Sequence, residues 1–269
     1  MKRFMVIAVV GASLVCSPRS EAILAADNAS NAAYNDGWQS GDNGGFGFGA
    51  WSLTIGGNRF YYISDSRNNG NGLDDGVVGG TSGDGDINSS GDKAWGMTAF
   101  GGDTAEALRL LNAPLLIGHT ISIDMDNGFI DGGATVGFGF QNNATAQNMF
   151  ELFFVGGTSF YQWVDEGGAH TSTIGYTDEG LNLSLKRTGL DSYTATITTR
   201  GGATQTISGD FGGTLDPTDL DKIRLFNANA GGGTDHNAYW NFVTVIPEPS
   251  VAALLVSACL AVIWQRRRV

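Results

Sequence analysis

Acidic and amide side chains gather between residues 65 and 92, where they are interspersed with glycines. Calcium prefers such oxygen ligands on flexible loops. The spacing does not fit an EF-hand loop, which needs acids at fixed alternate positions around a central glycine. Two interpretations therefore stand: a structural calcium site, or a solvated loop rich in turns. The carboxylates proposed for the calcium site are Asp65, Asp74, Asp75, Asp84 and Asp86.

Three tryptophans border loops rich in Gly, Asn and Asp, namely Trp38, Trp95 and Trp163. An aromatic ring can stack on the apolar C–H face of a sugar, so these three are the candidates for binding a glycan. Two further tryptophans, Trp51 and Trp240, fall in predicted strands and are assigned to the core. The alternative for all five is that they fill the interior of a β-protein.

Groups for catalysis are sparse. Concanavalin-like glucanases carry a Glu-x-Asp-x-x-Glu motif on one strand, and this chain has none; the nearest pattern, Asp124-x-Asp126, runs into an Asn-Gly turn. The three histidines are isolated in the sequence, and no Gly-x-Ser-x-Gly elbow occurs. A non-catalytic protein is therefore expected, with a polysaccharide-cleaving enzyme as the less favoured alternative.

The N-terminus has the pattern of a secretory signal. Lys2 and Arg3 precede an uncharged apolar run over residues 4–15, and small residues follow. Ser20-Glu21-Ala22 is a plausible cleavage motif, so residues 1–22 are predicted to be the signal peptide, with cleavage after Ala26 as the alternative. The pattern predicts an exported protein that meets the secretion machinery and signal peptidase.

The C-terminus combines Pro247-Glu248-Pro249, an apolar stretch over residues 251–264, and the cluster Arg266, Arg267 and Arg268. Fourteen helical residues would span about 21 Å, which is short for a bilayer core of about 30 Å. Terminal arginines can reach the cytoplasmic face, so a single transmembrane helix is predicted with the preceding domain outside.

Residues 247–269 resemble the PEP-CTERM sorting signal of Gram-negative bacteria. The resemblance implies that an exosortase handles the tail, and it implies an association with exopolysaccharide and biofilm. It places the protein first as an inner-membrane intermediate and finally at the cell surface or in the extracellular matrix.

Residues 27–246 form the predicted ectodomain. They carry nine basic and 25 acidic residues, a formal charge of −16 that disfavours nucleic acid as a partner. Both cysteines, Cys16 and Cys259, lie outside this range, so the ectodomain has no disulfide. Abundant glycine and about a dozen short alternating segments predict one all-β domain, a jelly-roll sandwich similar to concanavalin-like lectin domains.

Residues 103–111 are the one convincing helix in this prediction. Asp103 and Glu106 have the spacing of a capping box, good helix formers follow, and Pro114 ends the segment. The blocks 34–38, 124–131, 136–142, 150–157 and 223–229 also look like a recurrent ectodomain of PEP-CTERM proteins.

Three hypotheses for function follow. The first is a non-catalytic surface or matrix protein that binds exopolysaccharide. The second is a calcium-dependent lectin-like module, and the third is an enzyme that cleaves polysaccharide.

The calcium hypothesis predicts a measurable stabilisation. An ion that binds only the folded state at a hundred times its dissociation constant adds about 2.7 kcal/mol. At about 2–4 °C per kcal/mol, millimolar calcium should raise the melting temperature by several degrees over excess chelator. Sodium chloride of matched ionic strength is the control, because screening alone relieves charge repulsion. Equal midpoints in calcium and in matched salt would contradict a calcium site.

Overall fold

Apolar residues at every second position build most of the strands. In β11, Leu181–Arg187, and β12, Ser192–Thr199, buried and half-exposed side chains alternate along the whole strand. One side of such a strand packs on a core and the other faces outward, because successive side chains point to opposite faces of a sheet.

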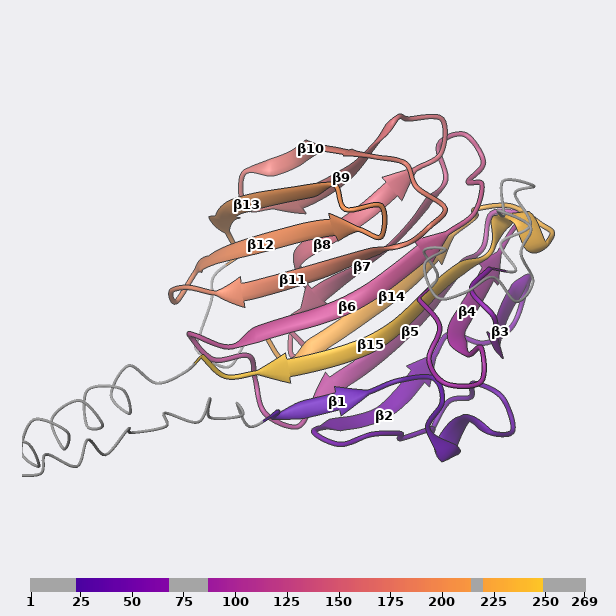
Figure 1. Cartoon of the computed structure of the whole chain (residues 1–269), viewed down its shortest axis with the longest axis horizontal. Coiled ribbons are helices and arrows are strands. Elements are labelled where there is room, and N and C mark those ends of the chain that lie inside the picture. Colours follow the sequence, from indigo (N-terminus) through magenta and orange to yellow (C-terminus); the bar gives the residue numbers. More distant parts are fainter. Residues whose placement is uncertain (1–22, 68–86, 214–219, 249–269) are drawn as a thin grey trace, which may run out of the picture.

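The computed structural model describes residues 23–67, 87–213 and 220–248. In this part of the chain, two antiparallel sheets pack face to face as an all-β sandwich (Figure 1). The eight-stranded sheet has the order β13-β12-β11-β6-β15-β4-β3, and β1 pairs with β15 beside β4. Its remaining strands are β13 (Thr204–Asp210), β6 (Thr120–Asn127), β15 (Ala238–Ile246), β4 (Ala94–Ala99), β3 (Arg59–Ser64) and β1 (Ala25–Asp27).

The seven-stranded sheet has the order β10-β9-β8-β7-β14-β5-β2. Two short 3-10 turns, η1 (Ala32–Tyr34) and η2 (Thr234–His236), interrupt the loops. The strands of this sheet are β10 (Gly168–Gly175), β9 (Phe160–Asp165), β8 (Asn148–Val155), β7 (Thr135–Gln141), β14 (Lys222–Ala228), β5 (Thr104–Leu111) and β2 (Phe48–Leu53).

One hydrophobic cluster fills the space between the sheets. It takes Ile123 and Leu183 from the eight-stranded sheet and Phe138 and Leu225 from the other, all at most 2% exposed. The sandwich predicted from the sequence is therefore confirmed in its coarse form, two all-β layers around a shared core.

The predicted helix over residues 103–111 is wrong: this segment is strand β5. Its side chains alternate between the two faces, with Ala105, Ala107 and Arg109 inward. β5 pairs with β14 on one side and β2 on the other. Sheet pairing along both edges outweighs a local helix preference that is worth only tenths of a kcal/mol per residue. Asp103 caps no helix and instead ion-pairs with Arg59 at 2.6 Å.

Arg109 points into the sandwich and ion-pairs there with Asp27. Its Nη1 lies 2.5 Å from Asp27 Oδ2, and both side chains are fully buried. Its Nε donates to the carbonyl of Gly49 at 2.8 Å and its Nη2 to the carbonyl of Gly44 at 2.7 Å. Tyr34 also donates its hydroxyl to Asp27. This network ties β1, β5, β2 and the loop before β2 together.

Several predicted features lie outside the described residues. These are the signal peptide (1–22), four of the five proposed calcium ligands, and the tail beyond Glu248. Across the described ranges, no helix is long and apolar enough to cross a bilayer.

Breaking the buried Asp27–Arg109 pair should lower the stability of the domain much more than breaking a partly exposed pair. Asp27→Asn should lower the free energy of unfolding by about 3–5 kcal/mol, because it leaves the Arg109 guanidinium buried without a counter-charge. Asp103→Asn is the matched control: it breaks the partly exposed pair with Arg59 and should cost under about 1 kcal/mol. Urea unfolding measures both, and similar losses in the two variants would contradict the role of the buried pair.

Candidate functional site

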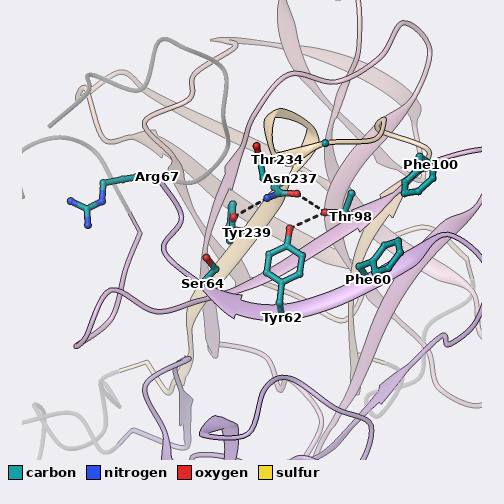
Figure 2. Close-up of a pocket in the computed structure, with 10 residues that line it drawn as sticks. Phe60, Tyr62, Ser64, Arg67, Thr98, Phe100, Thr234, Asn237 and Tyr239 are labelled. Atoms are coloured by element: carbon teal, nitrogen blue, oxygen red, sulfur yellow. Dashed lines mark hydrogen bonds between the residues drawn. The ribbon is translucent and has the colours of Figure 1, made fainter. Parts of the chain in front are cut away.

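An open cleft of about 600 Å³ lies at the β3 edge of the eight-stranded sheet. Aromatic rings, neutral polar groups and one arginine line it (Figure 2). The lining residues are Phe60, Tyr62, Ser64, Arg67, Thr98, Phe100, Gly233, Thr234, Asn237 and Tyr239.

The aromatic part of the cleft comes from β3, whose side chains point alternately to the core and away from it. Tyr61 and Ile63 pack against the core, so Phe60 and Tyr62 must point to the opposite face. An outward position on an edge strand is commonly polar, yet Phe60 is 51% exposed. Its ring stacks on that of Phe100 with centroids 6.0 Å apart and planes within 10°, and Figure 2 shows the two rings side by side.

Gly96 on β4 makes room for two tyrosines. In the register of the sheet, Gly96 lies opposite both Tyr62 and Tyr239. A Cβ on Gly96 would fall 2.1 Å from Tyr62 Cε2 and 2.8 Å from Tyr239 Cε1. The two rings meet edge to face with centroids 6.0 Å apart. The missing side chain is therefore what allows both rings to cover the strand.

A chain of hydrogen bonds runs along the wall of the cleft. The Tyr62 hydroxyl and Thr98 Oγ1 lie 2.9 Å apart, and Thr98 Oγ1 donates to Asn237 Oδ1 at 2.5 Å. Asn237 Nδ2 donates to the Tyr239 hydroxyl at 3.0 Å, as Figure 2 shows. Burial raises the pKa of Tyr239 to about 12 and that of Tyr62 further. The network is therefore uncharged at neutral pH.

Among the described residues that line the cleft, Arg67 carries the charge. Its Nη2 lies 2.5 Å from Asp65 Oδ2 and 3.5 Å from Asp92 Oδ1. Figure 2 shows its guanidinium well away from the Phe60 and Tyr62 rings. The surface beside the aromatic rings is thus apolar or neutral.

Asp65 is the proposed calcium ligand that the structure describes. Burial alone would raise the pKa of its carboxyl, but hydrogen bonds from Arg67 and Asn88 outweigh this and lower the pKa. Both of its oxygens are engaged by Arg67. Within the described ranges, no three His, Cys, Asp or Glu side chains are grouped closely enough to hold a metal ion.

Two of the three candidate tryptophans are in the core, so their assignment to a glycan-binding surface is wrong. Trp38 is 3% exposed and Trp95 is fully buried. Both pack on Trp51, edge to face, with ring centroids 5.2 and 5.5 Å from it. A ring enclosed by other rings offers no face to a sugar. The core assignment of Trp51 and Trp240 is confirmed, at 2% and 0% exposure.

Trp163 is half-buried on β9. It packs against the core, and its ring stacks on His170 with centroids 4.8 Å apart and planes 15° apart. His170 in turn lies 2.9 Å from Asp165, which accepts a hydrogen bond from the Tyr193 hydroxyl at 2.6 Å. One face of the indole is thus already covered by an imidazole.

Two carboxylates meet on the outer face of the seven-stranded sheet. Arg224 ion-pairs with Glu106 at 2.5 Å and also with Glu151. Burial raises the pKa of Glu151, against the opposing effect of Arg224. Because one guanidinium serves both carboxylates, the arrangement works as a cross-strand ion ladder that joins β5, β14 and β8. It also replaces the capping role predicted for Glu106.

Asp124 on β6 and Asp131, which follows that strand, have separate partners. Asp124 pairs with Arg200 at 2.7 Å and accepts from Asn182 at 2.6 Å, while Asp131 lies 3.2 Å from His236. Burial raises the pKa of Asp124, opposed by those two partners. The structure thus does not join Asp124 and Asp131 into one cluster.

Phe60, Tyr62 and Phe100 were not predicted as site residues. The sequence did contain a signal. Residues 59–64 carry large apolar side chains at successive positions, so both faces of the strand are apolar, whereas an ordinary half-exposed strand has only one apolar face. Identifying the exposed face still required knowing which side of β3 packs against the core.

No protein-family model matches the sequence, and no curated protein matches it. The sandwich is similar to a carbohydrate esterase of Shiga toxin-encoding bacteriophage phi24B, at 10% identity and TM-score 0.46, covering 74% of this chain and 90% of that one. It is also similar to the catalytic domain of a glycoside hydrolase family 131 protein from Coprinopsis cinerea (13%, TM-score 0.45, 71% and 78% covered). A legume lectin-like domain from Entamoeba histolytica matches at 9% identity and TM-score 0.43, with 59% and 85% covered. At these scores the likenesses assign neither a ligand nor a reaction to this chain.

Proposed function

We propose that this chain is an exported, exosortase-sorted, non-catalytic protein of the cell surface or extracellular matrix, and that its cleft binds neutral polysaccharide. The export and sorting parts rest on the signal pattern and on the tail with Pro247, Glu248 and Pro249. The binding part rests on the cleft at the β3 edge.

The observation that carries the binding proposal is the stacked pair of Phe60, which is exposed, and Phe100, which is half-buried, beside a neutral polar network. A pyranose has an apolar C–H face and a rim of hydroxyl groups, so it needs an aromatic surface together with hydrogen-bonding groups. Phe60 and Phe100 supply the surface, while Tyr62, Thr98 and Asn237 supply hydroxyl and amide groups. A volume of about 600 Å³ falls within the range of small-ligand sites.

Charge favours a neutral polymer over an acidic one. The ectodomain carries a formal charge of −16, which repels polyanions at a distance. At the cleft, Arg67 is neutralised by Asp65 and Asp92. No free cation among the described lining residues is thus available for a uronate or a sulfate.

Strand β15 relates the cleft to the predicted membrane tail. Tyr239, at its start, lines the cleft, and Ile246, at its end, directly precedes Pro247. Seven residue steps of about 3.3 Å separate these ends by about 23 Å. Figure 1 shows β3 and β4 at the opposite end of the sandwich from the point where β15 ends. A protein held by its tail would therefore present the cleft away from the membrane.

Binding should depend on the exposed rings. Phe60→Ala should weaken binding to a neutral glucan about tenfold, since a stacking contact of about 1.4 kcal/mol is lost. Phe160→Ala, which removes a ring of 43% exposure on the other sheet, is the matched control and should bind like the parent. Affinity electrophoresis in gels containing neutral glucan, galactomannan or alginate measures the effect.

The same gels separate the alternatives. Binding lost in chelator would favour the calcium-dependent lectin, and release of reducing ends would favour the enzyme. Equal binding by Phe60→Ala and the parent, or preference for alginate, would contradict the proposed cleft.

The tail generates a separate prediction. Replacing Pro247 and Pro249 by Ala should impair C-terminal processing in a strain with an active exosortase, while export continues, because the sorting motif is lost and the signal peptide is not. Immunoblots of fractions from cells carrying a tagged protein measure both steps. A variant that is processed and localised like the parent would rule out exosortase sorting through this motif.

A further inference from the structure

Exposed aliphatic side chains gather at the end of the sandwich where β15 ends. Three segments meet there: residues 23 and 24 before β1, the loop over residues 112–119 before β6, and the connection over residues 188–191 between β11 and β12. Figure 1 shows all three beside the end of β15. Their large aliphatic side chains are 43–57% exposed and are named here the apolar end surface: Ile23, Leu24, Leu116, Ile117 and Leu190.

Backbone hydrogen bonds hold the three segments together. The Leu24 N–H donates to the carbonyl of Val245, near the end of β15, at 2.8 Å. The Gly118 N–H donates to the carbonyl of Arg187, at the end of β11, also at 2.8 Å. Strand β6, which begins directly after the loop, lies between β15 and β11. The apolar end surface therefore belongs to one end of four neighbouring strands, β1, β15, β6 and β11.

A buried arginine fixes the loops that carry three of these side chains. Arg187 is 0% exposed, and its guanidinium donates to the carbonyls of Leu115 and Leu190 at 2.9 and 2.5 Å. Leu115 is itself 1% exposed, so the core already takes the apolar residue that this loop offers it. Leu116 and Ile117 follow on a backbone held in place, and they are presented outward as a preorganised apolar tip.

Charge is nearly absent from this end, although the ectodomain carries a formal charge of −16. Within the three segments and residues 247–248, Glu248 is the exposed charged residue, and it ion-pairs with Lys186. Burial lowers the pKa of His119, so its imidazole is neutral at pH 7. Single exposed leucines are ordinary on a protein surface, but several together without charge indicate a contact with an apolar partner.

The position of the tail indicates which partner covers the apolar end surface. The apolar stretch over residues 251–264 begins three residues after Glu248. Three residues reach at most about 11 Å even when fully extended. A tail that spans a bilayer would therefore hold this end of the sandwich at the lipid headgroups. Large aliphatic side chains at that depth can enter the boundary between headgroups and acyl chains.

We propose that the apolar end surface docks on a lipid bilayer, with Leu116, Ile117 and Leu190 inserted at the boundary between headgroups and acyl chains. The proposal rests on the proposed membrane tail, and it adds that the folded domain itself contacts lipid. Ile23 and Leu24 add to the contact when they remain in the mature chain, while the other three belong to it in either case. Docking would hold the domain in one orientation, with the cleft pointing away from the lipid.

A lipid-sensitive probe on the full-length chain tests this contact. Both native cysteines, Cys16 and Cys259, are replaced by Ser, and Ile117→Cys is labelled with an NBD maleimide. In phosphatidylcholine vesicles its emission should shift to the blue and be quenched by lipids that carry doxyl groups high on their acyl chains. Ile55→Cys in the same background is the matched control. Ile55 is 80% exposed in the loop that leads into β3, so its probe should be neither shifted nor quenched.

The ways in which this test can fail are distinguishable. Vesicles that float without the chain would overturn the membrane tail, and lipid docking with it. A chain that floats with the vesicles, while its probe at residue 117 behaves like the probe at residue 55, would overturn lipid docking alone. A blue shift at residue 117 without quenching by doxyl lipids would mean that the tail or a second copy covers the surface, and would overturn lipid docking as well.

Discussion

The fold depends on one buried ion pair. Arg109 and Asp27 come from strands of different sheets, and both side chains are fully buried. A charge in a sandwich interior is tolerated only with a counter-charge and hydrogen bonds, so Gly44 in the loop before β2 and Gly49 within β2 must supply carbonyls at fixed positions. In a domain without cysteine, this network takes the place of a covalent link between the N-terminal strand and the core.

The same network makes the N-terminal strand a part of the sandwich. β1 fills the edge of β15 beyond the three residues that pair with β4. Strand β15 thus has β4 and the cleft at one end and β1 at the other.

The aromatic residues show how far a sequence pattern leads. Aromatic rings can stack on sugars, but a position next to a glycine-rich loop in the sequence does not show that a ring is exposed. Trp38 and Trp95 border glycine-rich segments and are enclosed by Trp51. Phe60 lies within a strand and is exposed because it points to the face of β3 that does not pack on the core. Exposure is set by which side chains pack between the sheets, a long-range property that no local window contains.

The sequence by itself determined the all-β class, strands such as Leu181–Arg187, and the chemical character of both ends, because alternation, turn residues and terminal charge runs are local signals. The tertiary structure decided that residues 104–111 form a strand, because β14 and β2 pair with both its edges. It also decided that Arg109 faces inward, since Asp27 stands 82 positions earlier in the chain and meets it only in the folded state. The cleft likewise forms only where β3, β4 and β15 come together. The residue spacing within one strand does not show which other strands will lie beside it.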